Sequence, residues 1–294
     1  MTKNKDKFVG KKLTKDQIIA LTNDRRIEKY PWKIEQGYAR IIGKYVYSWE
    51  NIAKSFVNRY IKPYVSGGVA TLNDDNKHKD NIREHYGSAW YTLMEQNLNT
   101  LNLLIQHSLV EKEVNSEVHK FTASVDDYAL ASVKLQIGPI GINPIVSDDA
   151  IKDMLQGNIA YNVALIKKMN SKYAFDLQTD IYHTLEQGGG IGAITENIVN
   201  RTGMSIKHAK LIATDQTGKI LGQLHHYRAK KAGAEYYTWQ SMEDNRVRPA
   251  HQLLDQTVQK YDDPAGGDNG LMPGEPINCR CIDVAIFKDL EDII

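Results

Sequence analysis

Apolar side chains after Pro31 recur at alternating four- and three-residue steps, which is the spacing of one face of an α-helix. The stripe predicts a long helix that ends at Pro63, because proline disrupts a helix interior. A loop rich in Gly, Asn and Asp follows over residues 63–80, and a second stripe then predicts another long helix. The first stripe is Tyr38, Ile42, Tyr45, Trp49, Ile52 and Phe56, and the second is Ile82, Tyr86, Trp90, Leu93, Leu101 and Ile105. Two amphipathic helices joined by one loop predict an antiparallel pair.

The stretch QIGPIGINPIVSDDA, residues 136–150, interrupts this helical pattern. Its glycines and prolines do not fit a helix interior, whereas Ser147 followed by two aspartates is a good helix start. We therefore predict a helical N-terminal domain over residues 1–145 and a second domain over residues 146–294. Within the second domain, helices are expected over residues 151–166 and 175–185, the latter ending at Gly188.

The run GGGIG, Gly188–Gly192, could be read as a phosphate-binding loop, since a glycine-rich turn before a helix presents backbone N–H groups to an anion. A dinucleotide site or P-loop needs a preceding strand, and a P-loop also needs a following Gly-Lys-Ser/Thr. Neither is present. The run is therefore predicted to be a helix cap and a tight turn between helices.

Two short segments near the C-terminus have the alternation of β-strands. Tyr236–Gln240 alternates aromatic and polar side chains, with Trp239 as an apolar anchor. In Cys281–Phe287 the residues Cys281, Asp283 and Ala285 alternate with Ile282, Val284 and Ile286. Between them, Pro249 fits the first turn of a short helix that would place His251 and Asp255 on one face. The predicted fold class is mainly α with a small α+β C-terminal domain, in which helices accompany a short antiparallel sheet.

The order of motifs from Gly190 to Cys281 resembles the phage head morphogenesis family, the family of protein F of phage Mu and related minor capsid proteins. The matching features are a short helix with Ile194 and Ile198, the dipeptide Thr202-Gly203, the segment AKLIATDQT, Gly233, the strand YYTW, the motif EDNRVRPAHQLLD and the ending CRC. The residues of this ending that we take as its structural motif are Trp239, Asp244, Arg246, Arg248 and Asp255.

This resemblance implies a minor head protein of a tailed phage or prophage. Such a protein is expected in a few copies in the capsid interior near the portal vertex, and in the host cytoplasm during assembly. Its expected partners are the portal protein and the major capsid or scaffold proteins, with residues 1–145 making the portal or capsid contact. The implied role is to assist head assembly or DNA delivery.

Both cysteines of the chain lie in the sequence NCRC, residues 278–281. Strand geometry separates residues at this spacing by nearly the upper limit for a disulfide. Two thiolates on one side of a strand, with His251 as a third ligand and Asp255 or another histidine as a fourth, would instead form a tetrahedral zinc site. The alternative, that Cys279 and Cys281 are small buried hydrophobic residues, stays open.

An enzyme is the rival reading of the same region. Glu243, Asp244, His251 and Asp255 could hold a divalent ion and activate water, as in a metal-dependent hydrolase, a nuclease or a phage-delivered effector enzyme. Arg246 and Arg248 would then bind a phosphate. Since no nucleophile, base and orienting group follow a known catalytic order, we favour a structural turn in which Asp244, Arg246 and Arg248 form caps and salt bridges.

The net charge of the whole chain is +1, but one segment is strongly basic. Residues 201–233 contain seven Lys and Arg residues and a single acid, Asp215. Basic side chains at this density could contact packaged double-stranded DNA without sequence specificity, or form a solvated helix face. The candidate DNA contacts are Lys207, Lys210, Lys219, Arg228, Lys230 and Lys231. No apolar run approaches the roughly 18 residues that a membrane span requires, so no membrane span is expected.

Overall fold

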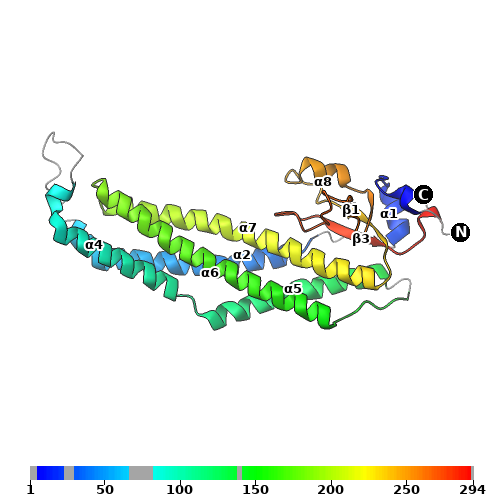
Figure 1. Cartoon of the computed structure of the whole chain (residues 1–294), viewed down its shortest axis with the longest axis horizontal. Coiled ribbons are helices and arrows are strands. Elements are labelled where there is room, and N and C mark those ends of the chain that lie inside the picture. The colour runs from blue at the N-terminus through cyan, green and yellow to red at the C-terminus, as the bar shows by residue number, and fades with distance from the viewer. Residues whose placement is uncertain (1–4, 23–29, 66–81, 138–140, 293–294) are drawn as a thin grey trace. The chain divides into compact units, whose positions relative to one another are not determined.

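The computed structural model describes residues 5–22, 30–65, 82–137 and 141–292, and the side chains of these residues except 5 and 82–88 (Figure 1). The predicted fold class is confirmed: the chain is mainly helical, with one small antiparallel sheet near its C-terminus. In the described chain, no helix is both long and apolar enough to cross a bilayer. The helices are α1 (Lys15–Thr22), α2 (Trp32–Phe56), α3 (Lys62–Val65), α4 (Ile82–His107), α5 (Glu111–Ile137), α6 (Asp149–Glu186), α7 (Ile191–Lys231) and α8 (Pro249–Leu254), and the strands are β1 (Tyr236–Gln240), β2 (Val258–Lys260) and β3 (Ile282–Ile286).

The chain forms two compact units, each built from separate stretches of sequence. The first contains Met1–Tyr38, Val118–Asn162 and Leu211–Ile294, and the second contains Ala39–Glu117 and Val163–Lys210. The limits of these two units differ from the predicted domain boundary between residues 145 and 146. The two domains over residues 1–145 and 146–294 therefore stay a prediction.

In the second unit, α4 packs against the end of the α2–α3 segment as an antiparallel partner. Asn97 Nδ2 donates to the Tyr60 carbonyl at 3.1 Å, and Trp90 Nε1 donates to the Tyr64 carbonyl at 3.2 Å. The later residue of α4, Asn97, contacts the earlier residue Tyr60, and the earlier residue Trp90 contacts the later residue Tyr64. The two helical segments therefore run antiparallel, as predicted. The expected loop between them falls largely on residues 66–81, outside the described residues.

The prediction that the first long helix ends at Pro63 is wrong. The chain stays helical to Val65, because Val57–Ile61 forms a π-helical turn in which the Lys62 N–H bonds to the Val57 carbonyl. A π turn shifts the backbone hydrogen-bond ladder by one residue, and this change just before Pro63 accommodates a residue that lacks an N–H.

The helices α6 and α7 are each continuous, so the predicted breaks within them are also wrong. Between the two segments predicted for α6, Asn170 is buried and donates to the Ile105 carbonyl at 2.9 Å. In α7, Thr202 is buried against Tyr173, with 3.1 Å between the two hydroxyl oxygens. Tertiary packing therefore overrides the weak local helix propensity at these positions.

The glycine run between α6 and α7 is a helix cap, as predicted. Gly188 has a φ of 75°, and the Gly189 N–H bonds to the Thr184 carbonyl at 2.8 Å, which is the pattern of a left-handed C-cap.

In the first unit, the strand order is β2-β1-β3, and both pairings are antiparallel. The predicted pairing of the two C-terminal strands is confirmed, with Trp239 opposite Asp283. The sequence analysis missed β2, because three residues are too few to show a period. Figure 1 shows β1 and β3 side by side beneath α8.

The N-terminal segment closes the outer edge of this sheet. Gly10 N–H donates to the Val258 carbonyl at 2.7 Å, and the Val258 N–H donates to the Lys11 carbonyl at 2.9 Å. A capping box between Thr14 and Gln17 then starts α1. The sheet core therefore includes residues from both ends of the chain, namely Phe8, Leu13, Ile18, Leu21, Tyr236, Val258, Ile286 and Leu290.

Candidate metal centre

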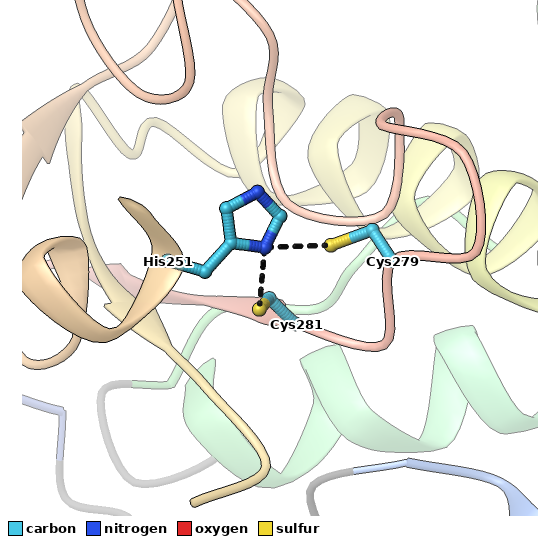
Figure 2. A group of neighbouring side chains, drawn as sticks. All are labelled: His251, Cys279 and Cys281. Carbon is cyan, nitrogen blue, oxygen red and sulfur yellow. Dashed lines mark hydrogen bonds between the residues drawn. The ribbon is translucent and has the colours of Figure 1, made fainter. Parts of the chain in front are cut away.

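Three buried side chains meet beside the sheet (Figure 2). His251 extends from α8, and Cys279 and Cys281 extend from the segment that leads into β3. The Nδ1 atom of His251 lies 3.6 Å from Cys279 Sγ and 3.5 Å from Cys281 Sγ. These three residues are 2%, 4% and 5% exposed, so the structure brings three of the four predicted ligands together in a buried site.

Asp255, the fourth predicted ligand, does not join this group. The helix α8 ends at Leu254, and Asp255 has a non-helical ψ of 129°, so the expected shared face with His251 is lost. Its carboxylate instead accepts a hydrogen bond from the Ser241 N–H at 2.7 Å. Asp255 thus ties the end of α8 to the end of β1.

The loop residue Asp268, which the sequence analysis missed, fixes the orientation of His251. Its Oδ2 lies 3.0 Å from His251 Nε2, so Nε2 carries the proton and donates it to the carboxylate. The Nδ1 lone pair is then directed at the two sulfur atoms. A carboxylate in this position is the usual partner of a metal-binding histidine.

The protonation of the three groups is coupled. A hydrogen bond from Cys281 lowers the pKa of Cys279 to about 4, and His251 contributes in the same direction against the effect of burial. Hydrogen bonding to Cys279 and burial raise the pKa of Cys281, while the Trp239 indole opposes the rise. The Cys279 hydrogen bond raises the pKa of His251 against the effect of burial. The site therefore already stabilises one thiolate.

Glycines in α7 let the cysteine-bearing loop approach the helix closely. A Cβ added at Gly218 would lie 2.2 Å from the Cys279 carbonyl oxygen, and one at Gly222 would lie 2.7 Å from the Pro273 carbonyl oxygen. From the loop side, Gly274 has a φ of 90°, and a Cβ there would lie 2.5 Å from the Gly218 carbonyl oxygen. The helix surface at Gly218 thus sets the position of Cys279.

We expect Gly218→Ala to lower the free energy of unfolding by about 1–3 kcal/mol, because the new methyl group overlaps backbone that cannot move independently of Cys279. The matched control is Gly203→Ala in the same helix, where a Cβ meets nothing within 4 Å. That change should stabilise the helix by up to about 1 kcal/mol. Urea denaturation measures the free energy of unfolding of both variants. Equal changes in the two variants would contradict close packing at Gly218.

Asp244 and the arginines around it form a structural turn. Both Asp244 oxygens accept hydrogen bonds from Arg280, at 2.7 and 2.8 Å, and Asp244 also accepts the Arg246 N–H at 3.0 Å. Arg248 donates to the Ile277 carbonyl, which joins the start of α8 to the loop before Cys279. The expected cap and ion pair are thus present at Asp244 and Arg246, whereas the Arg248 side chain makes a hydrogen bond to a carbonyl.

The proposed catalytic cluster is dispersed. Asp244 is held by arginines, Asp255 by the Ser241 N–H, and Glu243 lies 3.9 Å from Lys15. Among the described residues, the group with metal-ligand geometry is His251, Cys279 and Cys281, which contains no carboxylate. The arrangement therefore offers no carboxylate cage for a hydrolytic metal ion.

Hydrogen bonds from Arg280 hold the pKa of Asp244 at about 2, below its ordinary value. A carboxyl group whose pKa is lowered in the folded protein stabilises the fold fully when the pH is above its pKa in the unfolded chain, near 4. This stabilisation is lost as the pH falls from about 4 to 2. Asp244→Asn should therefore cost about 1–2 kcal/mol at pH 7, and the difference from the parent should shrink toward zero near pH 2. Urea denaturation of the parent and of Asp244→Asn between pH 7 and pH 2 measures this difference in the free energy of unfolding. A difference that does not change with pH would contradict the ion pair.

A second buried cluster, also missed in the sequence, lies around Asp283. His225 Nδ1 and the Tyr261 hydroxyl donate to its carboxylate, and His226 Nε2 lies 3.2 Å from it. Gln136 accepts the Ala285 N–H through Oε1, so its amide NH₂ faces His225 Nε2 at 3.3 Å. This pattern places the His225 proton on Nδ1, directed at Asp283.

All six candidate DNA-contact residues lie on α7, but they differ in exposure. Arg228 is wrong as a DNA contact, because it is 0% exposed and bonds to Asp126 and to the carbonyls of Ile145 and Val146. Lys219 pairs with Asp215 and Lys230 with Asp262. Lys207, Lys210 and Lys231 are exposed.

Comparisons with known proteins agree with the order of motifs in this region. Residues 176–284 match the family described as Phage Mu protein F like protein. A Haemophilus influenzae (strain Rd) protein described only as uncharacterized is 27% identical over 144 residues, which is 49% of this chain and 32% of that protein. No solved structure matches. The matched segment contains His251, Cys279 and Cys281, and over these residues the chain is similar to the Phage Mu protein F like proteins.

Proposed function

We propose that this protein is a minor head protein of a tailed phage or prophage, associated with the portal inside the capsid, where it assists head assembly or DNA delivery. The observation that carries the proposal is the family match over residues 176–284. A structural role is supported by the turn beside the sheet, where Asp244 pairs with Arg246 and Arg280. The partners proposed are the portal protein and the major capsid or scaffold proteins.

A contact with packaged DNA is part of this proposal. Lys207, Lys210 and Lys231 are its proposed contacts, since they are exposed on α7. Electrostatic binding of this kind weakens steeply as salt rises. A salt titration of binding to a mixed-sequence duplex tests it, with Lys207→Gln/Lys210→Gln as the variant and Lys168→Gln, on an exposed face of α6, as the control. No binding at low salt would exclude the contact.

The proposed location is tested by quantitative mass spectrometry of purified particles, scaled to the portal protein. A few copies per particle are expected. Comparison before and after triggered DNA release then separates a protein that stays at the portal from one that leaves with the DNA. Absence from particles, with abundant protein in infected cells, would contradict a head protein.

A further inference from the structure

We propose that His251, Cys279 and Cys281 bind one zinc ion, and that the fourth coordination position is held by water rather than by Asp255. This inference rests on the geometry of the site and does not depend on the proposed role in the phage head.

The distances between the side chains match a tetrahedral zinc ion. Zinc bonds of about 2.3 Å to sulfur and 2.05 Å to nitrogen, at a tetrahedral angle, place nitrogen and sulfur about 3.6 Å apart. The observed separations from His251 Nδ1 are 3.6 Å to Cys279 Sγ and 3.5 Å to Cys281 Sγ (Figure 2). No rearrangement of these two pairs is needed to place the ion between them.

Hydrogen bonding alone does not explain why two sulfur atoms face one nitrogen. Asp268 accepts a hydrogen bond from His251 Nε2, so Nδ1 is the nitrogen that faces the sulfur atoms. One ring nitrogen makes one good hydrogen bond, yet Cys279 and Cys281 approach Nδ1 at nearly equal distances. A cation that replaces the thiol protons would attract all three atoms at once.

The donor set favours zinc among the common divalent cations. Thiolate and imidazole are ligands that zinc prefers, whereas magnesium and calcium require oxygen. Asp268 supplies the outer carboxylate that orients a zinc-bound histidine. The Trp239 ring packs edge-on against His251, with 5.1 Å between the centroids, and covers the site with apolar surface.

The fourth position is assigned to water because the space beside the ligands is small and one unpartnered polar atom lines it. A cavity of about 30 Å³ is lined by the three ligands and by Asn278, among other residues. A cavity of this size holds one water molecule. The Asn278 Oδ1 atom is buried and has no hydrogen-bond partner among the described residues, so it is available to accept a proton from that water.

Metal analysis of the purified full chain, prepared without chelator and without a metal-affinity tag, tests the site. About one zinc per chain is expected, and Co²⁺ added after zinc removal should give tetrahedral visible bands with a thiolate charge-transfer band. Less than about a tenth of an equivalent of zinc, together with no cobalt bands, would overturn the proposal. Stoichiometric iron or copper in place of zinc would overturn the identity of the metal.

Variants separate the ligands from their neighbours. Cys279→Ser, Cys281→Ser and His251→Ala should each abolish tight cobalt binding, and Asp268→Asn should weaken it about 10- to 100-fold. Asp255→Asn keeps an acceptor for the Ser241 N–H and should change the affinity less than about threefold, whereas loss of a ligand would exceed tenfold. A tenfold loss in Asp255→Asn would overturn the assignment of the fourth position. If a ligand variant fails to fold, the zinc content of the parent protein still decides.

Discussion

Replacing Trp239 with alanine is expected to lower the free energy of unfolding of the sheet by about 3–5 kcal/mol, one of the two largest effects of a single substitution. Trp239 is fully buried in β1, the central strand of the sheet. The other residues of its core cluster are Ala229, Ala234, Tyr237, Tyr261, Cys279, Cys281 and Ala285, with Leu254, Met272 and Phe287 packed against it. Close-packed surroundings relax only in part when an indole is deleted, so a cavity remains.

Trp239→Phe is the matched comparison. The Trp239 Nε1 atom is buried, and the indole acts on the Cys281 sulfur, whose rise in pKa it opposes. Phenylalanine loses this donor but keeps most of the ring, so we expect a cost of at most about 2 kcal/mol. Amide hydrogen exchange over residues 236–240 and 282–286 measures both variants locally. Equal losses of unfolding free energy in Trp239→Phe and Trp239→Ala would show that the volume of the Trp239 side chain does not determine the stability of the sheet.

Replacing Asp283 with alanine is expected to cost about 3–5 kcal/mol as well. The carboxylate is 1% exposed and is the common partner of His225, His226 and Tyr261. Its removal leaves buried donors without an acceptor, and such donors are costly in a low-dielectric interior. The effect should appear in the same exchange experiment, since Asp283 lies in β3 opposite Trp239.

The control for Asp283 is Asp262→Asn, whose carboxylate pairs with Lys230 and is 71% exposed. An exposed ion pair contributes little, so the expected cost is below about 1 kcal/mol. Burial favours the neutral form of Asp283, but the two histidines outweigh it and hold the pKa of its carboxyl well below the ordinary value. Its contribution should therefore persist through mild acid and be lost only as the pH falls through that lower pKa. A small cost at pH 7 would contradict a stabilising buried carboxylate.

Local sequence patterns predicted α2, α4, most of α6, α8 and the two main strands, because these depend on side-chain period and turn chemistry, but they did not predict α5. The stripe from Tyr38 to Phe56 and the glycine cap at Gly188 are examples. Continuity through Asn170 and Thr202 was not predictable in this way, since tertiary contacts at those residues decide it.

The candidate metal site was predictable in part. The alternation of the two segments predicted that the strand around Trp239 pairs with the strand after Cys281, and this pairing brings Cys279 and Cys281 near His251. Asp268 is one acid among several in a loop without a period, so no local signal distinguishes it. The link between Lys12 and Thr257 joins opposite ends of the chain, and no window of sequence contains both.

X-ray absorption at the zinc edge of the purified full chain is the most direct measurement of the central claim, that His251, Cys279 and Cys281 hold one zinc ion. The account predicts two sulfur ligands at about 2.3 Å and two nitrogen or oxygen ligands at about 2.0 Å. Absence of zinc, or a shell of four sulfurs supplied by two chains, would contradict it.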